Sequence, residues 1–233
     1  MIAGLQKMTL LDFPGKVACT VFLQGCNLRC PFCHNSELFT GKPEPVMSRE
    51  EFFRFLASRK GLLDGVCVSG GEPTLCKELP EFLREIRAMG FAVKLDTNGC
   101  RPGVIKNLVE QNLVDYIAMD VKNAPEQYAQ TVGLTSLDLT PYEESLRFLI
   151  GGSVAYELRT TLVSQLHSET SIREMGHWLS ELVPDKKPGK LFLQRFVDRE
   201  TVLYSGLSAP EPEQVERYAE LLAPYAESIF IRN

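Results

Sequence analysis

The chain has 233 residues, of which 44% are hydrophobic and 24% are charged. This balance is typical of a globular protein with an apolar core and excludes an intrinsically disordered chain. No apolar run approaches the roughly 20 residues that a transmembrane helix needs, and the 25 basic and 30 acidic residues form no basic stripe for phosphates. We therefore expect neither a membrane nor a nucleic acid as a partner.

The seven cysteines are the most informative part of the composition. Their odd number excludes a complete set of internal disulfides, and the start MIAGLQKMTLLDF lacks the basic and continuous apolar regions of a signal peptide. We expect a cytoplasmic protein whose thiols stay reduced. Cysteines in that compartment indicate metal or redox chemistry.

Strands and helices are predicted to alternate along the chain. Residues 1–16 form an N-terminal extension against the first strand. Short runs rich in β-branched residues predict strands at 17–23, 65–69, 91–95, 114–121, 155–163, 190–196 and 228–231. Segments of helical period predict helices at 48–60, 77–89, 102–111, 140–150, 169–182 and 211–224.

Near-continuous hydrophobic strands, each followed by a helix, are typical of a parallel sheet covered by helices. The six clear strand-helix units are fewer than the eight of a full TIM barrel. We therefore predict an α/β fold, a partial, open (β/α)6 TIM-like barrel of parallel strands. Residues 1–233 are expected to form a single domain.

Three cysteines lie in the loop 24–36, directly after the first predicted strand: Cys26, Cys30 and Cys33. Thiolates three and four positions apart can converge on one metal centre, and soft sulfur ligands favour an iron–sulfur cluster or zinc. Three ligands for a four-iron cluster leave one iron open to another ligand. A structural zinc site that also uses His34 is the alternative at this point.

The loop and its flanks, FLQGCNLRCPFCHN preceded by LLDFPGK, resemble the radical S-adenosylmethionine enzymes and, within them, the branch that activates glycyl-radical enzymes. The resemblance is strongest over residues 4–37. It implies that Cys26, Cys30 and Cys33 bind a [4Fe-4S] cluster and are catalytic through it. In that family S-adenosylmethionine chelates the fourth iron, and its reductive cleavage gives a 5′-deoxyadenosyl radical that abstracts a hydrogen atom.

Three further motifs follow predicted strands: SGGEP at 69–73, DTNG at 96–99 and MDVK at 119–122. Each motif alone also reads as a turn or a solvated strand end, but the C-terminal ends of barrel strands are where such folds carry their sites. The resemblance implies cofactor-binding roles for Gly70, Gly71, Glu72, Asp96, Thr97, Asn98, Asp120 and Lys122. It also allows a monovalent cation between the carboxylates of Asp96 and Asp120.

Two more residues acquire a role by the same resemblance. Arg159 lies in the apolar run YELRTTLV, so it must face water or pair with a buried anion; the family implies a cofactor carboxylate as that partner. Phe32 matches an aromatic position near the adenine, with ordinary packing as the alternative. Outside these motifs, Cys19 and Cys67 are predicted core residues, and His167 and His177 are predicted surface residues.

The predicted function is an activating enzyme that abstracts a hydrogen atom from a glycine of a large partner enzyme. By the nearest match, that partner is anaerobic (class III) ribonucleotide reductase, and a flavodoxin- or ferredoxin-type protein donates the electron. The alternatives are an activator of another such enzyme, for example pyruvate formate-lyase, and a small-molecule radical enzyme such as 7-carboxy-7-deazaguanine synthase. A non-enzymatic zinc or electron-transfer module leaves GGEP, DTNG and MDVK unexplained.

Overall fold

The computed structural model describes residues 2–41, 44–152 and 154–232, so Met1 of the predicted extension 1–16 lies outside the described residues. The strands are β1 (Ile2–Thr9), β2 (Ala18–Leu23), β3 (Gly65–Gly70), β4 (Ala92–Thr97), β5 (Tyr116–Asp120), β6 (Ala155–Leu162), β7 (Lys190–Arg195) and β8 (Ser228–Arg232). The α-helices are α1 (Glu37–Thr40), α2 (Arg49–Ala57), α3 (Leu79–Ala88), α4 (Pro102–Glu110), α5 (Pro125–Thr131), α6 (Thr140–Gly151), α7 (Glu169–Glu181) and α8 (Pro212–Leu222), and one short 3-10 helix covers Pro73–Leu75.

The strands follow one another in the sheet in the order of the chain, from β1 to β8. The first pair, β1 and β2, is antiparallel, while β2–β3, β3–β4, β6–β7 and β7–β8 are parallel. The order has two ends, β1 and β8, so the sheet is not closed. This confirms the predicted α/β fold with a mostly parallel, open sheet.

Two compact units divide the chain. Unit 1 comprises Met1–Asn27, Glu37–Thr97 and Gly103–Ala118, and unit 2 comprises Leu28–Ser36, Asn98–Pro102 and Met119–Asn233. Unit 1 therefore holds β1 to β4 and the start of β5, whereas unit 2 holds the end of β5 and β6 to β8. The chain passes between the units within the cysteine loop, within DTNG and within β5.

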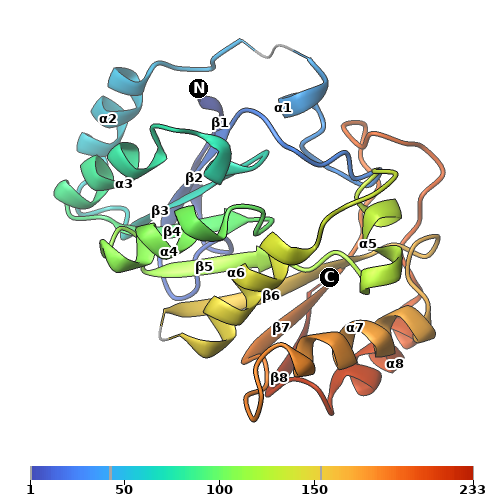
Figure 1. Ribbon diagram of the computed structural model, residues 1–233. Coiled ribbons are helices and arrows are strands. Elements are labelled where there is room, and N and C mark those ends of the chain that lie inside the picture. Colours follow the sequence, from blue (N-terminus) through green and yellow to red (C-terminus); the bar gives the residue numbers. More distant parts are fainter. Residues whose placement is uncertain (1, 42–43, 153, 233) are drawn as a thin grey trace. The chain divides into compact units, whose positions relative to one another are not determined.

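The core of unit 1 lies between its parallel strands and the helices that follow them. Val21, Val68 and Leu95 occupy one row across β2, β3 and β4 and are fully buried. Helices α2 and α3 lie side by side (Figure 1), where the rings of Phe52 and Phe82 are 5.3 Å apart. Burying an aliphatic or phenyl side chain of this size stabilises a fold by about 1.5–3 kcal/mol.

Unit 2 repeats this construction on β6, β7 and β8. Leu158 and Leu193 are fully buried on neighbouring strands, and α7 and α8 lie side by side over them (Figure 1). The side chain of Ser168 caps the first turn of α7 by accepting a hydrogen bond from the Ser171 amide. Unsatisfied amides at a helix start are commonly paired in this way.

Most predicted elements are present with small shifts at their ends, but β1, α1 and α5 were not predicted as such. The N-terminal extension is strand β1, which pairs with β2 from Ile2 to Thr9. Its sequence IAGLQKMT is buried mainly at its two ends, so it lacks the alternating pattern of a half-buried strand. Within the described residues, no helix is long and apolar enough to cross a membrane.

Candidate functional site

In unit 1 the GGEP motif is bonded to the beginning of the cysteine loop. The Gly71 amide donates to the Leu23 carbonyl at 2.9 Å, and the Glu72 amide donates to the Gly25 carbonyl at 2.7 Å. A Cβ atom on Gly71 would lie only 2.0 Å from the Gly25 oxygen, and one on Gly70, whose φ is +123°, would lie 2.3 Å from the Leu23 oxygen. Only glycine permits this approach, which brings the motif against the residue before Cys26.

The carboxylate of Glu72 joins GGEP to DTNG. Its side chain is buried, and its Oε1 atom accepts hydrogen bonds from the Thr74 amide at 3.1 Å, from the Thr74 hydroxyl and from the Thr97 hydroxyl at 2.7 Å. A buried carboxylate is costly unless donors surround it. Glu72 therefore fixes the ends of β3 and β4 to each other within unit 1.

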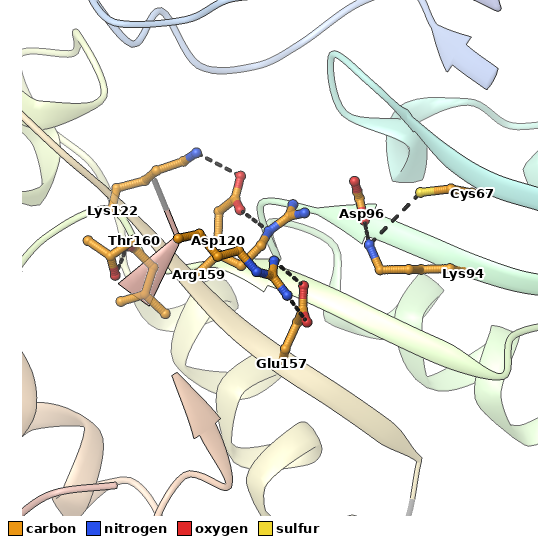
Figure 2. Close-up of polar contacts among 10 residues, drawn as sticks. Cys67, Lys94, Asp96, Asp120, Lys122, Glu157, Arg159 and Thr160 are labelled. Carbon is orange, nitrogen blue, oxygen red and sulfur yellow. Dashed lines mark hydrogen bonds and ion pairs between the residues drawn. The ribbon is translucent and has the colours of Figure 1, made fainter. Parts of the chain in front are cut away.

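Asp96 is paired with Lys94, a residue outside the predicted motifs. The ammonium of Lys94, whose side chain is 2% exposed, forms an ion pair with Asp96 Oδ1 and lies 3.9 Å from Cys67 Sγ (Figure 2). The signal in the sequence was a lysine inside the apolar run FAVKL, two positions before the aspartate. Residues at this spacing on a strand share one face.

In unit 2, Asp120 holds two cationic side chains at the end of β5. Its Oδ2 atom is 2.8 Å from Lys122 Nζ, and its Oδ1 atom is 3.0 Å from Arg159 Nε (Figure 2). The predicted need of Arg159 for an anion is thus met by Asp120. Burial alone would lower the pKa of Lys122, but the charges of Asp120 and Cys30 outweigh it and raise that pKa above its usual value.

The second half of the cysteine loop also belongs to unit 2. The Cys33 amide donates to the Cys30 carbonyl at 3.1 Å, and the Lys122 ammonium lies 5.8 Å from the centroid of the Phe32 ring. Burial raises the pKa of the Cys33 thiol, while the charge of Lys122 opposes that rise. Lys122 therefore acts electrostatically on both cysteines of this half of the loop.

The part of chain after β7 holds this half of the loop in place. His34 stacks on the Phe196 ring with centroids 5.7 Å apart, and its Nε2 atom is 2.6 Å from the Val197 carbonyl oxygen. The Ser36 hydroxyl donates to the Thr201 carbonyl at 2.6 Å. Since Nε2 of His34 is engaged with backbone, the alternative of zinc ligation by that nitrogen is disfavoured.

DTNG and MDVK meet in unit 2 where Gly99 lies against Met119. The Asn98 side chain accepts a hydrogen bond from the Cys100 amide at 2.9 Å, which closes the turn. Gly99 has a φ of +86°, and a Cβ atom there would lie 2.1 Å from Met119 Cε. The Gly99 carbonyl accepts from the Ser145 hydroxyl at 2.7 Å, so the turn is fixed on both sides.

The prediction that His167 is a surface residue was wrong. Its side chain is buried, its Nδ1 atom accepts from the Val163 amide at 3.1 Å, and its Nε2 atom is 2.9 Å from the Lys122 carbonyl oxygen. Burial lowers the pKa of His167 below its usual value. A loop histidine that folds back onto the segment just after β5 depends on tertiary packing, which no local pattern shows. His177 is exposed, as predicted.

The two predicted core cysteines are buried, which confirms that prediction. Burial raises the pKa of Cys19 to about 12, so this thiol stays protonated near neutral pH. Among the residues that the structure describes, no three His, Cys, Asp or Glu side chains lie close enough together to hold a metal ion. The fit to a [4Fe-4S] cluster rests on the donors themselves: three soft thiols in one loop, two of them under the influence of the Lys122 ammonium.

The fold and these motifs define an α/β protein whose polar clusters lie at the C-terminal ends of parallel strands. The radical SAM superfamily matches residues 20–150, more than half of the chain. The chain belongs to this superfamily and is an enzyme of that kind. The superfamily implies a [4Fe-4S] cluster and S-adenosylmethionine as cofactors.

Similar proteins agree with this assignment. A Methanocaldococcus jannaschii protein, provisionally named a glycyl-radical enzyme activating enzyme, is 29% identical over 100% of this chain and 96% of its own length. The pyruvate formate-lyase-activating enzyme of Clostridium pasteurianum is 27% identical over 78% of this chain and 76% of that enzyme. Streptococcus suis SuiB, solved with S-adenosylmethionine bound, has a TM-score of 0.67 and 12% identity over 92% of this chain and 52% of SuiB, a likeness of fold alone.

Proposed function

We propose that this enzyme activates a glycyl-radical enzyme by abstracting a hydrogen atom from one of its glycines. The similarity to the M. jannaschii protein, which runs over the whole chain and nearly all of that relative, carries the proposal. The similarity to the C. pasteurianum pyruvate formate-lyase-activating enzyme supports the same class.

In this proposal Cys26, Cys30 and Cys33 hold the [4Fe-4S] cluster. With the cofactors bound, one electron and one S-adenosylmethionine are consumed for each glycine, giving methionine, 5′-deoxyadenosine and a glycyl radical. The Lys122 ammonium favours the thiolate form of Cys30 and Cys33, which is the form that binds iron. The contacts of His34 with Phe196 and Val197 keep the loop in one conformation.

The residues of unit 1 are proposed to bind S-adenosylmethionine at the ends of β3 and β4. Gly70 and Gly71 leave the backbone accessible to a ligand amino group because they carry no side chain. Glu72 is proposed to hold this backbone in position, because its buried carboxylate accepts a hydrogen bond from the Thr97 hydroxyl. Asp96 is a suitable acceptor for ribose hydroxyls, since a carboxylate accepts two such bonds.

The residues of unit 2 are proposed to bind the same cofactor through charge and stacking. Lys122 and Arg159, both bonded to Asp120, suit the carboxylate of the methionine part. Phe32, which is 4% exposed and lies next to the Lys122 ammonium, is proposed to contact the adenine. Asn98 shapes the turn that follows β4.

The finer parts of the proposal concern partners and setting. We propose anaerobic ribonucleotide reductase as the glycyl-radical enzyme, a flavodoxin- or ferredoxin-type protein as the electron donor, and the cytoplasm as the compartment. The two compact units are proposed to form one radical SAM domain over residues 1–233. Three segments of the chain support this, because the cysteine loop, DTNG and strand β5 each have residues in both units.

The test is the formation of a glycyl radical under anaerobic conditions. The chain is reconstituted with iron and sulfide, reduced with dithionite and mixed with S-adenosylmethionine and anaerobic ribonucleotide reductase, with pyruvate formate-lyase in a parallel sample. Electron paramagnetic resonance should detect a glycyl radical on the reductase. A radical on the lyase alone would replace the partner, and 5′-deoxyadenosine without a radical on either protein would favour a small-molecule substrate.

A further inference from the structure

Lys94 is a deeply buried cation beside a proposed cofactor-binding residue. It lies in the middle of β4 between Val93 and Leu95, both fully buried, and its own side chain is 2% exposed. Its ammonium pairs with Asp96 and approaches Cys67 on the neighbouring strand β3, whose Cα is the register partner of the Lys94 Cα (Figure 2). Asp96 is 15% exposed and lies two residues closer to the C-terminal end of the strand.

Stability alone does not account for this lysine. Lysine is almost never fully buried unless it is paired, and replacing a buried ion pair by apolar residues of similar volume is often neutral or stabilising. An apolar side chain of similar length would fill the same buried space beside Cys67 without a charge to compensate. The cost of burying Lys94 indicates a role for its charge, and its contact with Asp96 identifies the group on which that charge acts.

The geometry points to Lys94 as a built-in counter-ion for Asp96, a positioning residue that takes the place of a bound monovalent cation. The inference rests on the proposed function, in which Asp96 binds S-adenosylmethionine. Lys94 reaches Asp96 from the buried part of the strand, so it fixes one oxygen of the carboxylate and places a positive charge beside it. A second cation beside Asp96 would meet the charge already present there.

Asp120 in unit 2 is likewise paired with cationic side chains of the chain itself. These side chains are Lys122 and Arg159. The resemblance allowed a monovalent cation between Asp96 and Asp120. Each of these carboxylates is already paired with one or more cationic side chains of its own unit. We therefore expect S-adenosylmethionine binding to be independent of sodium and potassium ions.

The experiment measures S-adenosylmethionine binding to the anaerobically reconstituted chain by equilibrium dialysis. Sodium, potassium or tetramethylammonium chloride is present at equal ionic strength. The dissociation constant of the wild-type chain should agree within about twofold in the three salts. A weakening of about tenfold in tetramethylammonium, the size expected when an opposite charge next to a carboxylate is lost, would overturn the inference. No binding in any salt would instead overturn the proposed function on which it rests.

The variant Lys94→Met sharpens the test. Its dissociation constant should rise about tenfold in tetramethylammonium and recover in sodium or potassium, because a metal cation can then supply the positive charge that Asp96 has lost. Binding like the wild type, or weak binding that no cation restores, would contradict the counter-ion role. Lys7→Met, which removes an exposed lysine from β1 of the same unit, is the matched control and should change nothing. If Lys94→Met does not fold, the wild-type comparison still decides.

Discussion

The two aspartates near strand ends, Asp96 and Asp120, form ion pairs with cations that differ in burial. Asp96 in unit 1 is paired with Lys94, which reaches it from the interior of the sheet, whereas Asp120 in unit 2 is paired with Lys122 and Arg159, which are 13% and 15% exposed. A charge as deeply buried as that of Lys94 is insulated from solvent, and those around Asp120 are reached by water and ligands. The comparison suggests that unit 1 fixes a carboxylate and that unit 2 offers cations to a ligand.

The largest effect is expected in the cysteine loop, which contributes Cys26 to unit 1 and Cys30 and Cys33 to unit 2. Replacing any one of the three by alanine should abolish both cluster assembly and cleavage of S-adenosylmethionine, because each thiolate is proposed to bind its own iron. Iron content and 5′-deoxyadenosine formation measure the two losses. Cys19→Ala is the control, since that thiol is buried and protonated; equal tolerance of all four changes would contradict the assignment.

The next effect separates the two aspartates by stability. Asp96→Asn leaves the buried Lys94 without its carboxylate and should lower the free energy of unfolding by about 3–5 kcal/mol. Asp120→Asn should cost less, about 1–2 kcal/mol, because Asp120 is 27% exposed and water can solvate the cations that it leaves. Urea unfolding of both variants under identical conditions measures the difference. A larger loss for Asp120→Asn would reverse the comparison.

The smallest effect concerns pH and the support of Lys122 by His167. Burial depresses the pKa of His167 in the folded state. In the unfolded chain the same histidine takes up a proton once the pH falls below its ordinary pKa of about 6.5. Unfolding then gains protons, and stability present above that pH is lost as the pH falls through it. Urea midpoints from pH 8 to pH 5 should show this loss, and His167→Gln should flatten it. His177→Gln, at an exposed position, should leave the slope unchanged.

The sequence was sufficient to predict the parallel strands, because VACTVFL, GVCVS and LFLQRF are apolar runs that local patterns reveal. It also placed GGEP, DTNG and MDVK at strand ends. It did not reveal Lys94, since a lysine in an apolar run is normally assigned to a solvated face, and only the pairing of β4 with β3 places it beside Cys67. His167 escaped for a similar reason: its burial depends on the carbonyl of Lys122, 45 residues away.

Cleavage of S-adenosylmethionine is the central claim, and its product 5′-deoxyadenosine is the most direct measure of it. The reconstituted, dithionite-reduced chain should form 5′-deoxyadenosine and methionine in equal amounts under anaerobic conditions, and Cys30→Ala should form neither. A wild-type chain that carries its full complement of iron and binds S-adenosylmethionine, yet releases no 5′-deoxyadenosine, would contradict the account.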